Sequence, residues 1–320
     1  MPEQSPPSTR LADNPLIAPG LSVDQLPATI DAREKPKRER FGIGAWLATL
    51  WLAGITLAAI LAPVLPIEDP NTSNADIVRV GPLTNGALLG GDGLGRDVFS
   101  RCIWGARTSL LIGFGAIVLG LLIGGALGLI AGYYRGKLDS GLSASFNILL
   151  AFPQLVLALT LVAVLAPSTP ENPASASERL RVLIITLGIV SIPVLARITR
   201  ANTLAWAQRE FVLAGRAQGA KNGRIILREV LPNVMPAMFS IALLGVAVVI
   251  VIEGGLSILG LSVPPPTASW GNIIAEAQGD LRDTPHSIFA PSAFIFLTVL
   301  SLNYLGDVVR ARFDVREAAI

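Results

Sequence analysis

The chain has 320 residues, of which 52% are hydrophobic and 15% charged, and its mean hydropathy is +0.59. Soluble domains carry about a quarter charged residues, so this composition indicates an integral membrane protein. The formal net charge of +2 is too small to indicate a nucleic-acid partner. The single cysteine, Cys102, excludes an internal disulfide, and the single histidine, His286, excludes the common histidine-based zinc sites. We expect no metal and no cofactor.

Six apolar stretches are long enough, or nearly so, to cross a hydrocarbon core of about 30 Å. They are Ile43–Val64, Ser109–Ala131, Leu142–Ala166, Val182–Ala196, Val234–Ile252 and Ile288–Gly306. The fourth is short, but arginines at its end can snorkel to the surface. We therefore predict an all-α integral membrane protein with six transmembrane helices. The predicted parts are a disordered tail (1–41), a first transmembrane helix (42–65), an extracytoplasmic segment (66–107), a five-helix core (108–307) with a cytoplasmic loop (201–232), and a C-terminal tail (308–320).

The orientation follows from the distribution of positive charge, because Lys and Arg concentrate on the cytoplasmic side of membrane proteins. With the N-terminus inside, 18 of the 25 Lys and Arg residues fall on cytoplasmic segments. Both termini and the loop 201–232 are therefore predicted to be cytoplasmic.

The second apolar stretch carries a small residue at every fourth position, and these residues share one helix face: Ala116, Gly120, Gly124, Gly128 and Gly132. Such a stripe lets another helix approach closely. Packing inside this subunit and contact with a second subunit both remain open.

The segment before the second span has helical periodicity. Val98, Cys102 and Ala106 fall on one face, and Arg96 and Arg101 fall on the other. This pattern predicts an amphipathic helix on the outer membrane surface.

No catalytic constellation is visible. The stretch GYYRGK (132–137) is one residue too short for a phosphate-binding loop, and it lacks the required Ser or Thr. We therefore expect neither catalysis nor nucleotide binding by this chain. Glu253 is the one acidic residue at the edge of an apolar run. It is predicted either to face the bundle interior or a water path, as a pathway or gate residue, or to lie at a wetted helix end.

The loop between the fourth and fifth spans reads FVLAGRAQGAKNGRIILREVLPN (211–233). Residues 210–218 and 223–230 can each be helical, Gly219 provides the turn between them, and Pro232 ends the second helix. The pattern predicts a short helical hairpin with Ala220, Lys221 and Asn222 at its tip. Such a hairpin suits insertion into a groove on a soluble partner.

This loop resembles the "EAA" loop of ABC importer permeases, in particular the dipeptide and oligopeptide branch. The matching residues are Glu210, Phe211, Val212, Ala214, Arg216, Ala217, Gly219, Ala220, Arg224, Ile225, Ile226, Arg228, Leu231, Pro232 and Asn233. The sequence departs from the pattern at Gly215, where alanine is usual, and at Glu229, where histidine is usual. GDGLGRDVFSRCIWGARTSL (91–110) and SILGLSVPPPTASWGNII (257–274) resemble two further stretches of the family, which narrows the resemblance to the C-type subunit.

The resemblance implies a type I ABC importer permease in the bacterial inner membrane. Its implied partners are a second related permease, two ATPase subunits, an extracytoplasmic solute-binding protein and the lipid bilayer, with a peptide in transit. By the same resemblance the hairpin is the coupling element, with contacts at Glu210, Ala214, Gly215, Gly219, Ala220, Lys221, Asn222 and Arg224. A nickel, glutathione or sugar-conjugate importer shares these motifs. A stand-alone secondary transporter or channel and a membrane-embedded enzyme are alternatives of other classes. Internal repeats and paired intramembrane charges would indicate a stand-alone secondary transporter or channel, and a polar cluster within the spans would indicate a membrane-embedded enzyme. The sequence shows neither pattern.

Overall fold

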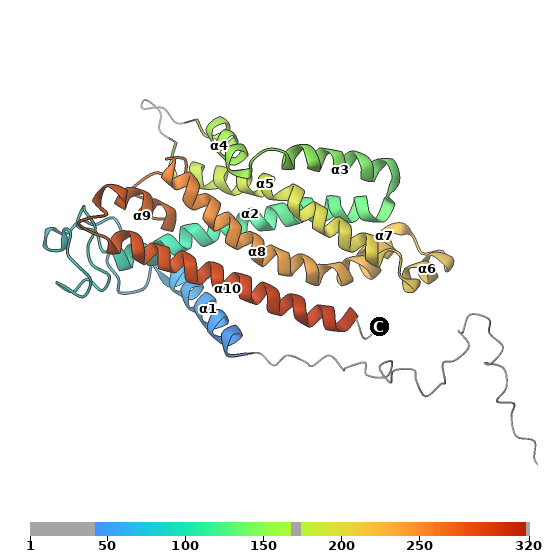
Figure 1. The fold of residues 1–320 in the computed structure, drawn as a ribbon, viewed down its shortest axis with the longest axis horizontal. Coiled ribbons are helices and arrows are strands. Elements are labelled where there is room, and N and C mark those ends of the chain that lie inside the picture. The colour runs from blue at the N-terminus through green and yellow to red at the C-terminus, as the bar shows by residue number, and fades with distance from the viewer. Residues whose placement is uncertain (1–41, 168–173, 318–320) are drawn as a thin grey trace, which may run out of the picture. The chain divides into compact units, whose positions relative to one another are not determined.

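The computed structural model describes residues 42–167 and 174–317 (Figure 1). The helices in this part of the chain are α1 (Ile43–Leu61), α2 (Val98–Tyr134), α3 (Gly136–Leu150), α4 (Gln154–Leu165), α5 (Ala176–Trp206), α6 (Glu210–Ala217), α7 (Asn222–Ile225), α8 (Leu231–Ile258), α9 (Trp270–Ala277) and α10 (His286–Glu317). A π-helical turn, Ile226–Val230, joins α7 to α8. The described residues contain no β-strand, only two isolated bridges. The all-α prediction is confirmed, and the predicted tail 1–41 lies outside the described residues.

Five helical stretches among the described residues have the length and apolar character of a membrane span: α1, α2, α5, the run Asn222–Ile258, and α10 over His286–Arg312. Each contains most of one predicted span. All except α1 extend well beyond the apolar run, because helical hydrogen bonding continues into the polar flanks. Residues 308–317 accordingly continue α10 and do not form a separate tail.

The prediction of a separate amphipathic helix at the outer surface was wrong. These residues form the first turns of the 37-residue helix α2. The carboxylate of Asp97 caps this helix by accepting hydrogen bonds from the backbone N–H groups of Phe99 and Ser100, at 3.3 and 2.9 Å. No proline interrupts the chain between this cap and the apolar stretch. One helix therefore runs through both segments.

The third predicted span is a bent pair of helices. α3 and α4 are separated by three residues and make an angle of 88°. Pro153 stands immediately before α4. Proline disfavours a helical conformation at the preceding residue, which explains the break. Leu142–Ala166 was predicted as one transmembrane helix, and the structure instead has two helices joined by a bend.

Contacts show that the bent pair still carries the chain from one end of the bundle to the other. At its start, Asp139 of α3 accepts a hydrogen bond from Arg200, near the end of α5, at 2.7 Å. After the bend, Leu155 at the start of α4 lies against Gly255, near the end of α8. Counted as one crossing, the pair brings the five long helices to six candidate spans by length and composition, which is the predicted number.

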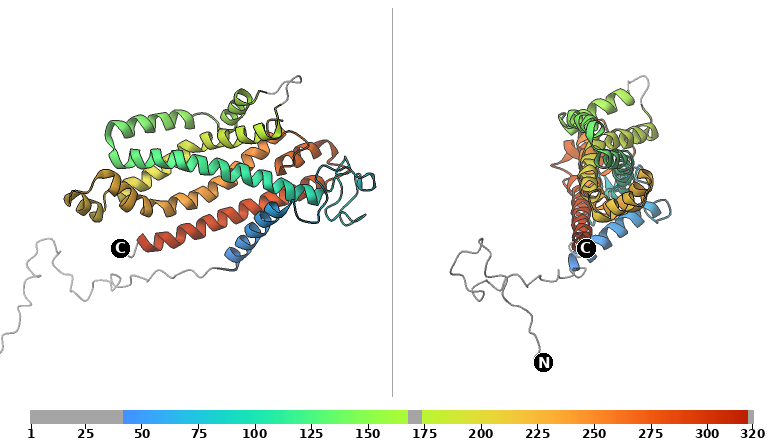
Figure 2. Two further views of the ribbon diagram at one scale, coloured as in Figure 1. Left: turned by 180° about the vertical axis from the view of Figure 1, so that it is seen from behind. Right: turned by 90° about the vertical axis from the view of Figure 1, so that its right-hand side faces the viewer.

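The two ends of the bundle carry different structures. α6 and α7 lie at one end, termed the hairpin end, and α9 lies at the other, termed the α9 end (Figures 1 and 2). α1 and α10 run antiparallel, because Trp51 donates a hydrogen bond to Thr298 (3.1 Å) and Gly44 lies against Tyr304. The hydroxyl of Ser240, early in α8, donates to the carbonyl oxygen of Gly306, late in α10, at 2.6 Å. The start of α1 and the end of α10 therefore belong to the hairpin end.

The small-residue stripe of α2 packs against α5 of the same subunit. A Cβ atom added at Gly124 would lie 2.6 Å from the carbonyl oxygen of Ile192, and one at Gly128 would lie 2.4 Å from that of Ala196. Gly120 and Gly132 also face α5, and Ala116 is fully buried. The stripe is thus occupied by close packing within the bundle, which decides between the two readings left open by the sequence.

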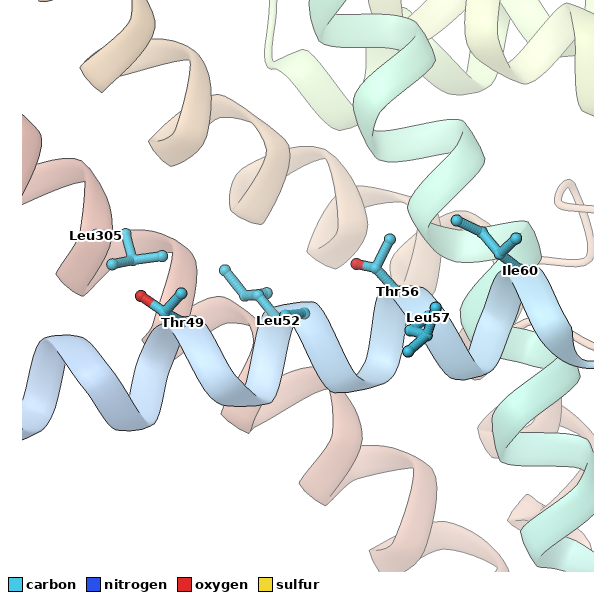
Figure 3. Close-up of a pocket in the computed structure, with 7 residues that line it drawn as sticks. Thr49, Leu52, Thr56, Leu57, Ile60 and Leu305 are labelled. Carbon is cyan, nitrogen blue, oxygen red and sulfur yellow. The ribbon is translucent and has the colours of Figure 1, made fainter.

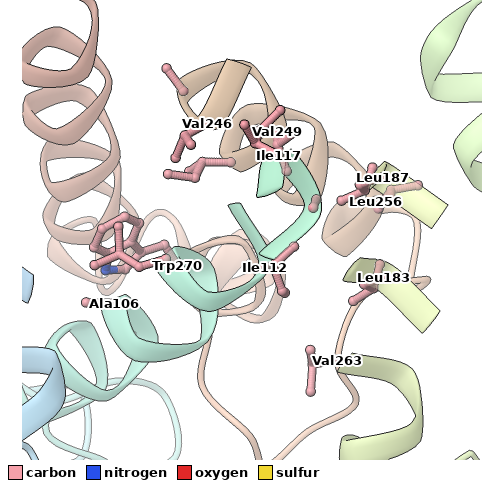
Figure 4. Packing of buried hydrophobic residues seen from close by; sticks show 14 of the residues in the cluster. Ala106, Ile112, Ile117, Leu183, Leu187, Val246, Val249, Leu256, Val263 and Trp270 are labelled. Atoms are coloured by element: carbon pink, nitrogen blue, oxygen red, sulfur yellow. The ribbon is translucent and has the colours of Figure 1, made fainter. Parts of the chain in front are cut away.

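The main core lies between α2, α5, α8 and the segment that precedes α9 (Figure 4). The figure labels Ile112 and Ile117 of α2, Leu183 and Leu187 of α5, and Val246, Val249 and Leu256 of α8, together with Val263 and Trp270. Lipid tails are as apolar as these side chains, so close packing and buried polar contacts, more than the hydrophobic effect, hold the helices together.

A groove of about 410 Å³ lies between α1 and α10 (Figure 3). Its lining carries two threonine hydroxyls and is otherwise apolar: Thr49, Leu52, Ala53, Thr56, Leu57, Ile60 and Leu305. Along α1, Ile43 is 82% exposed and Leu50 is 70% exposed. This face of the protein suits contact with lipid.

Candidate functional site

The predicted turn at Gly219 is confirmed. α6 ends in a Schellman motif, in which the N–H of Ala220 donates to the carbonyl of Gly215 (3.1 Å) and the N–H of Gly219 donates to that of Arg216 (2.9 Å). Gly219 has a φ of +79°. A residue with a Cβ atom is strained in this left-handed conformation, so the turn requires glycine at this position.

The second arm of the hairpin does not end at Pro232. α7, the π-helical turn and α8 follow one another without interruption from Asn222 to Ile258. At the turn, the N–H of Leu231 bonds to the carbonyl of Ile226, five residues back. This wider turn accommodates Pro232, which has no N–H to donate. The predicted helix end was therefore wrong, and the second arm is the first part of a membrane-spanning helix.

The inner face of the hairpin is anchored on the end of α2. Val212 and Ile225 are 0% and 1% exposed and pack in one cluster with Tyr133 and Trp206. Burial of such a side chain is worth about 1.5–3 kcal/mol. The hydroxyl of Tyr133 also donates a hydrogen bond to the side-chain oxygen of Asn222 at 3.0 Å. These contacts fix the hairpin relative to the transmembrane helices.

A cation–π contact supports this anchor. The guanidinium of Arg216 lies 4.9 Å from the ring centre of Tyr133. Asn222 and Arg216 therefore both hold the hairpin in place. The sequence did not assign Asn222 this role, because its partner Tyr133 lies 89 residues away along the chain.

The outer face of the hairpin is exposed and mixes apolar with basic side chains. Of the predicted contact residues, Glu210, Ala214, Gly219, Lys221, Asn222 and Arg224 are exposed, and Gly215 and Ala220 are half-buried. The sequence did not single out Leu213 and Leu227, which are 53% and 64% exposed. Leu227 lies in the π-helical turn, and Leu213 lies in α6. We call the eight predicted contact residues, together with Leu213 and Leu227, the docking face.

A cleft of about 410 Å³ adjoins the docking face where the hairpin meets the end of α2. Its lining includes two basic side chains, and the lining residues are Tyr133, Tyr134, Arg135, Ala207, Gln208, Leu213 and Arg216. The hairpin end thus combines a projecting surface with a neighbouring hollow.

Four charged side chains form a ring at the α9 end. Arg96 and Arg101 each contact both Asp92 and Glu276, with nitrogen–oxygen distances of 2.7 and 2.7 Å for Arg96 and of 2.9 and 2.9 Å for Arg101. The side chain of Arg101 is only 1% exposed. The ring ties the loop before α2 to α9.

Arg96 and Arg101 were predicted to lie on the polar face of a surface helix, and this prediction was wrong. Both are buried because a carboxylate from the preceding loop and another from α9 neutralise them. Helical spacing alone separates polar from apolar faces and does not show which polar face is covered.

Glu253 lies near the α9 end of α8 and is 1% exposed. The alternative of a wetted helix end is thereby excluded. One carboxyl oxygen accepts hydrogen bonds from the hydroxyls of Ser262, Ser269 and Ser257, at 2.6, 2.9 and 3.0 Å. Across residues 42–167 and 174–317, no group of three or more His, Cys, Asp and Glu side chains is arranged to hold a metal ion.

The family described as "binding-protein-dependent transport system inner membrane component" matches residues 116–318. This chain belongs to that family. The range that matches the family begins in the small-residue stripe of α2 and includes the hairpin, Glu253 and α9.

Curated relatives cover most of this permease. The dipeptide transport system permease protein DppC of Alkalihalophilus pseudofirmus is 34% identical over 91% of this chain and 92% of its own. The glutathione transport system permease protein GsiD of Pectobacterium atrosepticum is 34% identical over 87% of each chain. A putative peptide transport system permease protein of Brucella suis is 34% identical over 92% of this chain and 94% of its own.

A solved structure supports the fold of the permease. A chain of the MetNI methionine ABC transporter, in an inward-facing conformation, superposes with a TM-score of 0.54 at 19% identity. The superposition covers 67% of this chain and 96% of that chain. The permease thus has the type I ABC importer permease fold and is a multi-pass membrane protein.

Proposed function

We propose that this permease forms half of the translocation pore of an ATP-driven, binding-protein-dependent importer of di- and oligopeptides. The other half is a second related permease, and an extracytoplasmic solute-binding protein delivers the cargo. Family membership supports this assignment, and so do the dipeptide and peptide permeases among the relatives. ATP hydrolysis is assigned to two partner subunits.

The observation that carries the proposal is the anchored hairpin. Its inner face is buried on α2, and its second arm continues directly into a membrane-spanning helix. A projecting helical element with apolar and basic side chains suits insertion into a groove of a soluble partner. We assign the docking face, with Glu210, Ala214, Gly215, Gly219, Ala220, Lys221, Asn222 and Arg224, to contact with an ATPase subunit.

The hairpin end is assigned to the cytoplasm and the α9 end to the outside of the bacterial inner membrane. The distribution of Lys and Arg supports this orientation, since 18 of the 25 fall on the segments placed inside. Both termini are then cytoplasmic.

Glutathione is a second candidate cargo, because permeases named for glutathione transport are 34–36% identical to this chain. It is itself a small peptide derivative, so both cargoes fit the same class of importer.

Uptake by the reconstituted complex tests the proposal. The chain is purified with the second permease, the ATPase subunits and the binding protein encoded nearby, and then placed in proteoliposomes. ATP-dependent accumulation of a labelled dipeptide is expected, with glutathione as the competing cargo. The purified chain alone is expected to show no ATP turnover. Turnover by the chain alone, or a complete complex that moves neither cargo, contradicts the proposal.

A further inference from the structure

The segment between α8 and α10 folds back over the outer turns of α2. A Cβ atom added at Gly105 of α2 would lie 3.2 Å from the backbone of Ser269 and Trp270, and one at Gly271 would lie 2.8 Å from the backbone of Gly254 in α8. The indole N–H of Trp270 donates to the carbonyl of Cys102 at 2.9 Å. α9 is therefore held directly against both α2 and α8.

The carboxyl group of Glu253 fastens both ends of the loop that leads into α9. Ser262 stands at the start of this loop, and Ser269 stands at its end as the N-cap of α9. Both hydroxyls donate to the same oxygen, Oε1, as does that of Ser257 in α8 itself. The same carboxyl oxygen thus joins both ends of the loop to α8, in addition to the backbone hydrogen bond from Leu261 to Leu256 at 2.8 Å.

This arrangement is poorly explained as a device for stability alone. The second carboxyl oxygen of Glu253, Oε2, is buried and makes no hydrogen bond of normal geometry, although the hydroxyl of Ser109 in α2 is close enough to interact with the carboxyl group. Leaving a buried polar atom unpaired costs about 1–3 kcal/mol. Movement of the loop would break the two hydrogen bonds that Ser262 and Ser269 donate to Oε1, while the bond from Ser257 lies within α8 and would remain. The contacts from Ser262 and Ser269 are therefore the ones that a displaced loop would lose.

Glu253 also lies on the same helix as the hairpin. The helical run from Asn222 to Ile258 contains 37 residues. At about 1.5 Å per residue it is about 55 Å long. The docking face lies at one end of this run, and Glu253 lies near the other.

We propose that Glu253 is the positioning residue through which α8 moves the outer segment 259–277. Displacement of the hairpin shifts α8, and the contacts of Glu253 with Ser262 and Ser269 make the loop and α9 follow. This inference rests on the proposed importer, because it requires an ATPase partner that moves the hairpin.

A labelling experiment tests the closure without any partner. Val263 lies in the fastened loop and is 2% exposed, and the native Cys102 is fully buried. In the full chain in membranes, a Val263→Cys reporter is expected to react slowly with a membrane-impermeant maleimide. Adding Glu253→Ala should raise the reaction rate at least about fivefold, the lower range of an allosteric coupling. Glu253→Gln retains the acceptor oxygen and should keep the rate near that of the reporter alone. Equal rates in all three proteins overturn the inference.

The assembled transporter tests the coupling. In the complete complex, Glu253→Ala is expected to reduce the stimulation of ATP hydrolysis by loaded binding protein at least about fivefold while the ATPase subunits still co-purify. Glu253→Gln should restore most of the stimulation. The matched control is Thr298→Val, which removes the partly buried hydrogen bond from Trp51 between α1 and α10. Equal losses in the control and in Glu253→Ala overturn the inference. Failure of the wild-type complex to transport counts against the proposed function instead, since the labelling result does not depend on it.

If Glu253→Ala fails to reach the membrane, the double variant Ser262→Ala/Ser269→Ala replaces it in both experiments. This variant removes two of the three donors and leaves the carboxyl group in place. The same increase in labelling and the same loss of stimulation are expected. Wild-type behaviour in both experiments overturns the inference.

Discussion

At the scale of single residues, Gly219 is where conformation rather than contact makes the residue necessary. A Cβ atom added there meets no atom within 4 Å, but the φ of +79° remains unfavourable for any residue with a side chain. We expect Gly219→Val to cost at least about 1 kcal/mol at the turn and to disturb the docking face. The variant should insert normally into the membrane. The ATPase subunits should co-purify with it poorly, and cargo uptake should be lost.

Two matched changes separate conformation from bulk. Gly215→Ala adds a methyl group in open space four residues earlier, at a helical position without positive φ. Gly219→Asn keeps a residue that tolerates the left-handed region. Both should retain most uptake. Wild-type uptake by Gly219→Val shows that the hairpin is only a connector.

Arg101 gives a second prediction at this scale. Its loss leaves the buried carboxylate of Asp92 and the half-buried carboxylate of Glu276 with one arginine between them. Removing one partner from a buried ion pair costs about 3–5 kcal/mol. Arg101→Ala is therefore expected to lower the melting temperature of the purified protein strongly. The control is Arg79→Ala, whose pair with Asp280 is 50% and 31% exposed and should contribute at most about 1 kcal/mol. Similar melting temperatures for the two variants contradict the structural role of the ring.

Sequence patterns and the structure differ at this scale for one physical reason. The turn at Gly219 depends on neighbours within five residues, and it could be predicted from them. The ring depends on Glu276, which is 175 residues from Arg101. The bond between Tyr133 and Asn222 is similarly distant. No local periodicity contains that information.

At the scale of helices, the contact between α2 and α5 depends on the absence of side chains. A Cβ atom at Gly128 would lie 2.4 Å from the carbonyl oxygen of Ala196, so the two backbones must separate to admit it. We expect Gly128→Ala to destabilise the protein by about 1–3 kcal/mol, as overpacking does. Thermal unfolding in detergent measures this loss.

Graded and matched controls sharpen the test. Gly120→Ala should cost less, because its nearest contacts are 3.0–3.1 Å away. Gly54→Ala in α1 meets nothing within 4 Å and should be neutral or slightly stabilising. If Gly128→Ala unfolds at the wild-type temperature, the close approach of α2 and α5 is not required for stability.

The apolar runs located every crossing because a long uncharged stretch has few alternatives to a membrane helix. The runs did not locate the ends, since polar residues extend α5 and α10. The structural effects of two prolines were also predicted wrongly. Pro153 breaks the third crossing at 88°, whereas Pro232 is absorbed by a π-helical turn. The difference depends on backbone geometry that the residue type alone does not specify.

At the scale of the whole molecule, sidedness follows from charge and is fixed by the number of crossings. The bent pair α3–α4 returns the chain to the α9 end, so the hairpin, the start of α1 and the end of α10 belong to one side. That side carries the excess of Lys and Arg. Translocation of such charge is disfavoured, so we expect this side to remain in the cytoplasm.

Single cysteines test this orientation in intact cells, because the native Cys102 is fully buried. Gln218 in the hairpin and Arg282 near α9 are both exposed. An impermeant maleimide added outside should label Arg282→Cys and spare Gln218→Cys until the membrane is permeabilised. Fusion reporters should agree, reading cytoplasmic at Ile320 and external after Ala166. Labelling of Gln218→Cys from outside would show that the orientation is the reverse of the predicted one. The hairpin would then lie on the side without ATP, where it has no ATPase to engage.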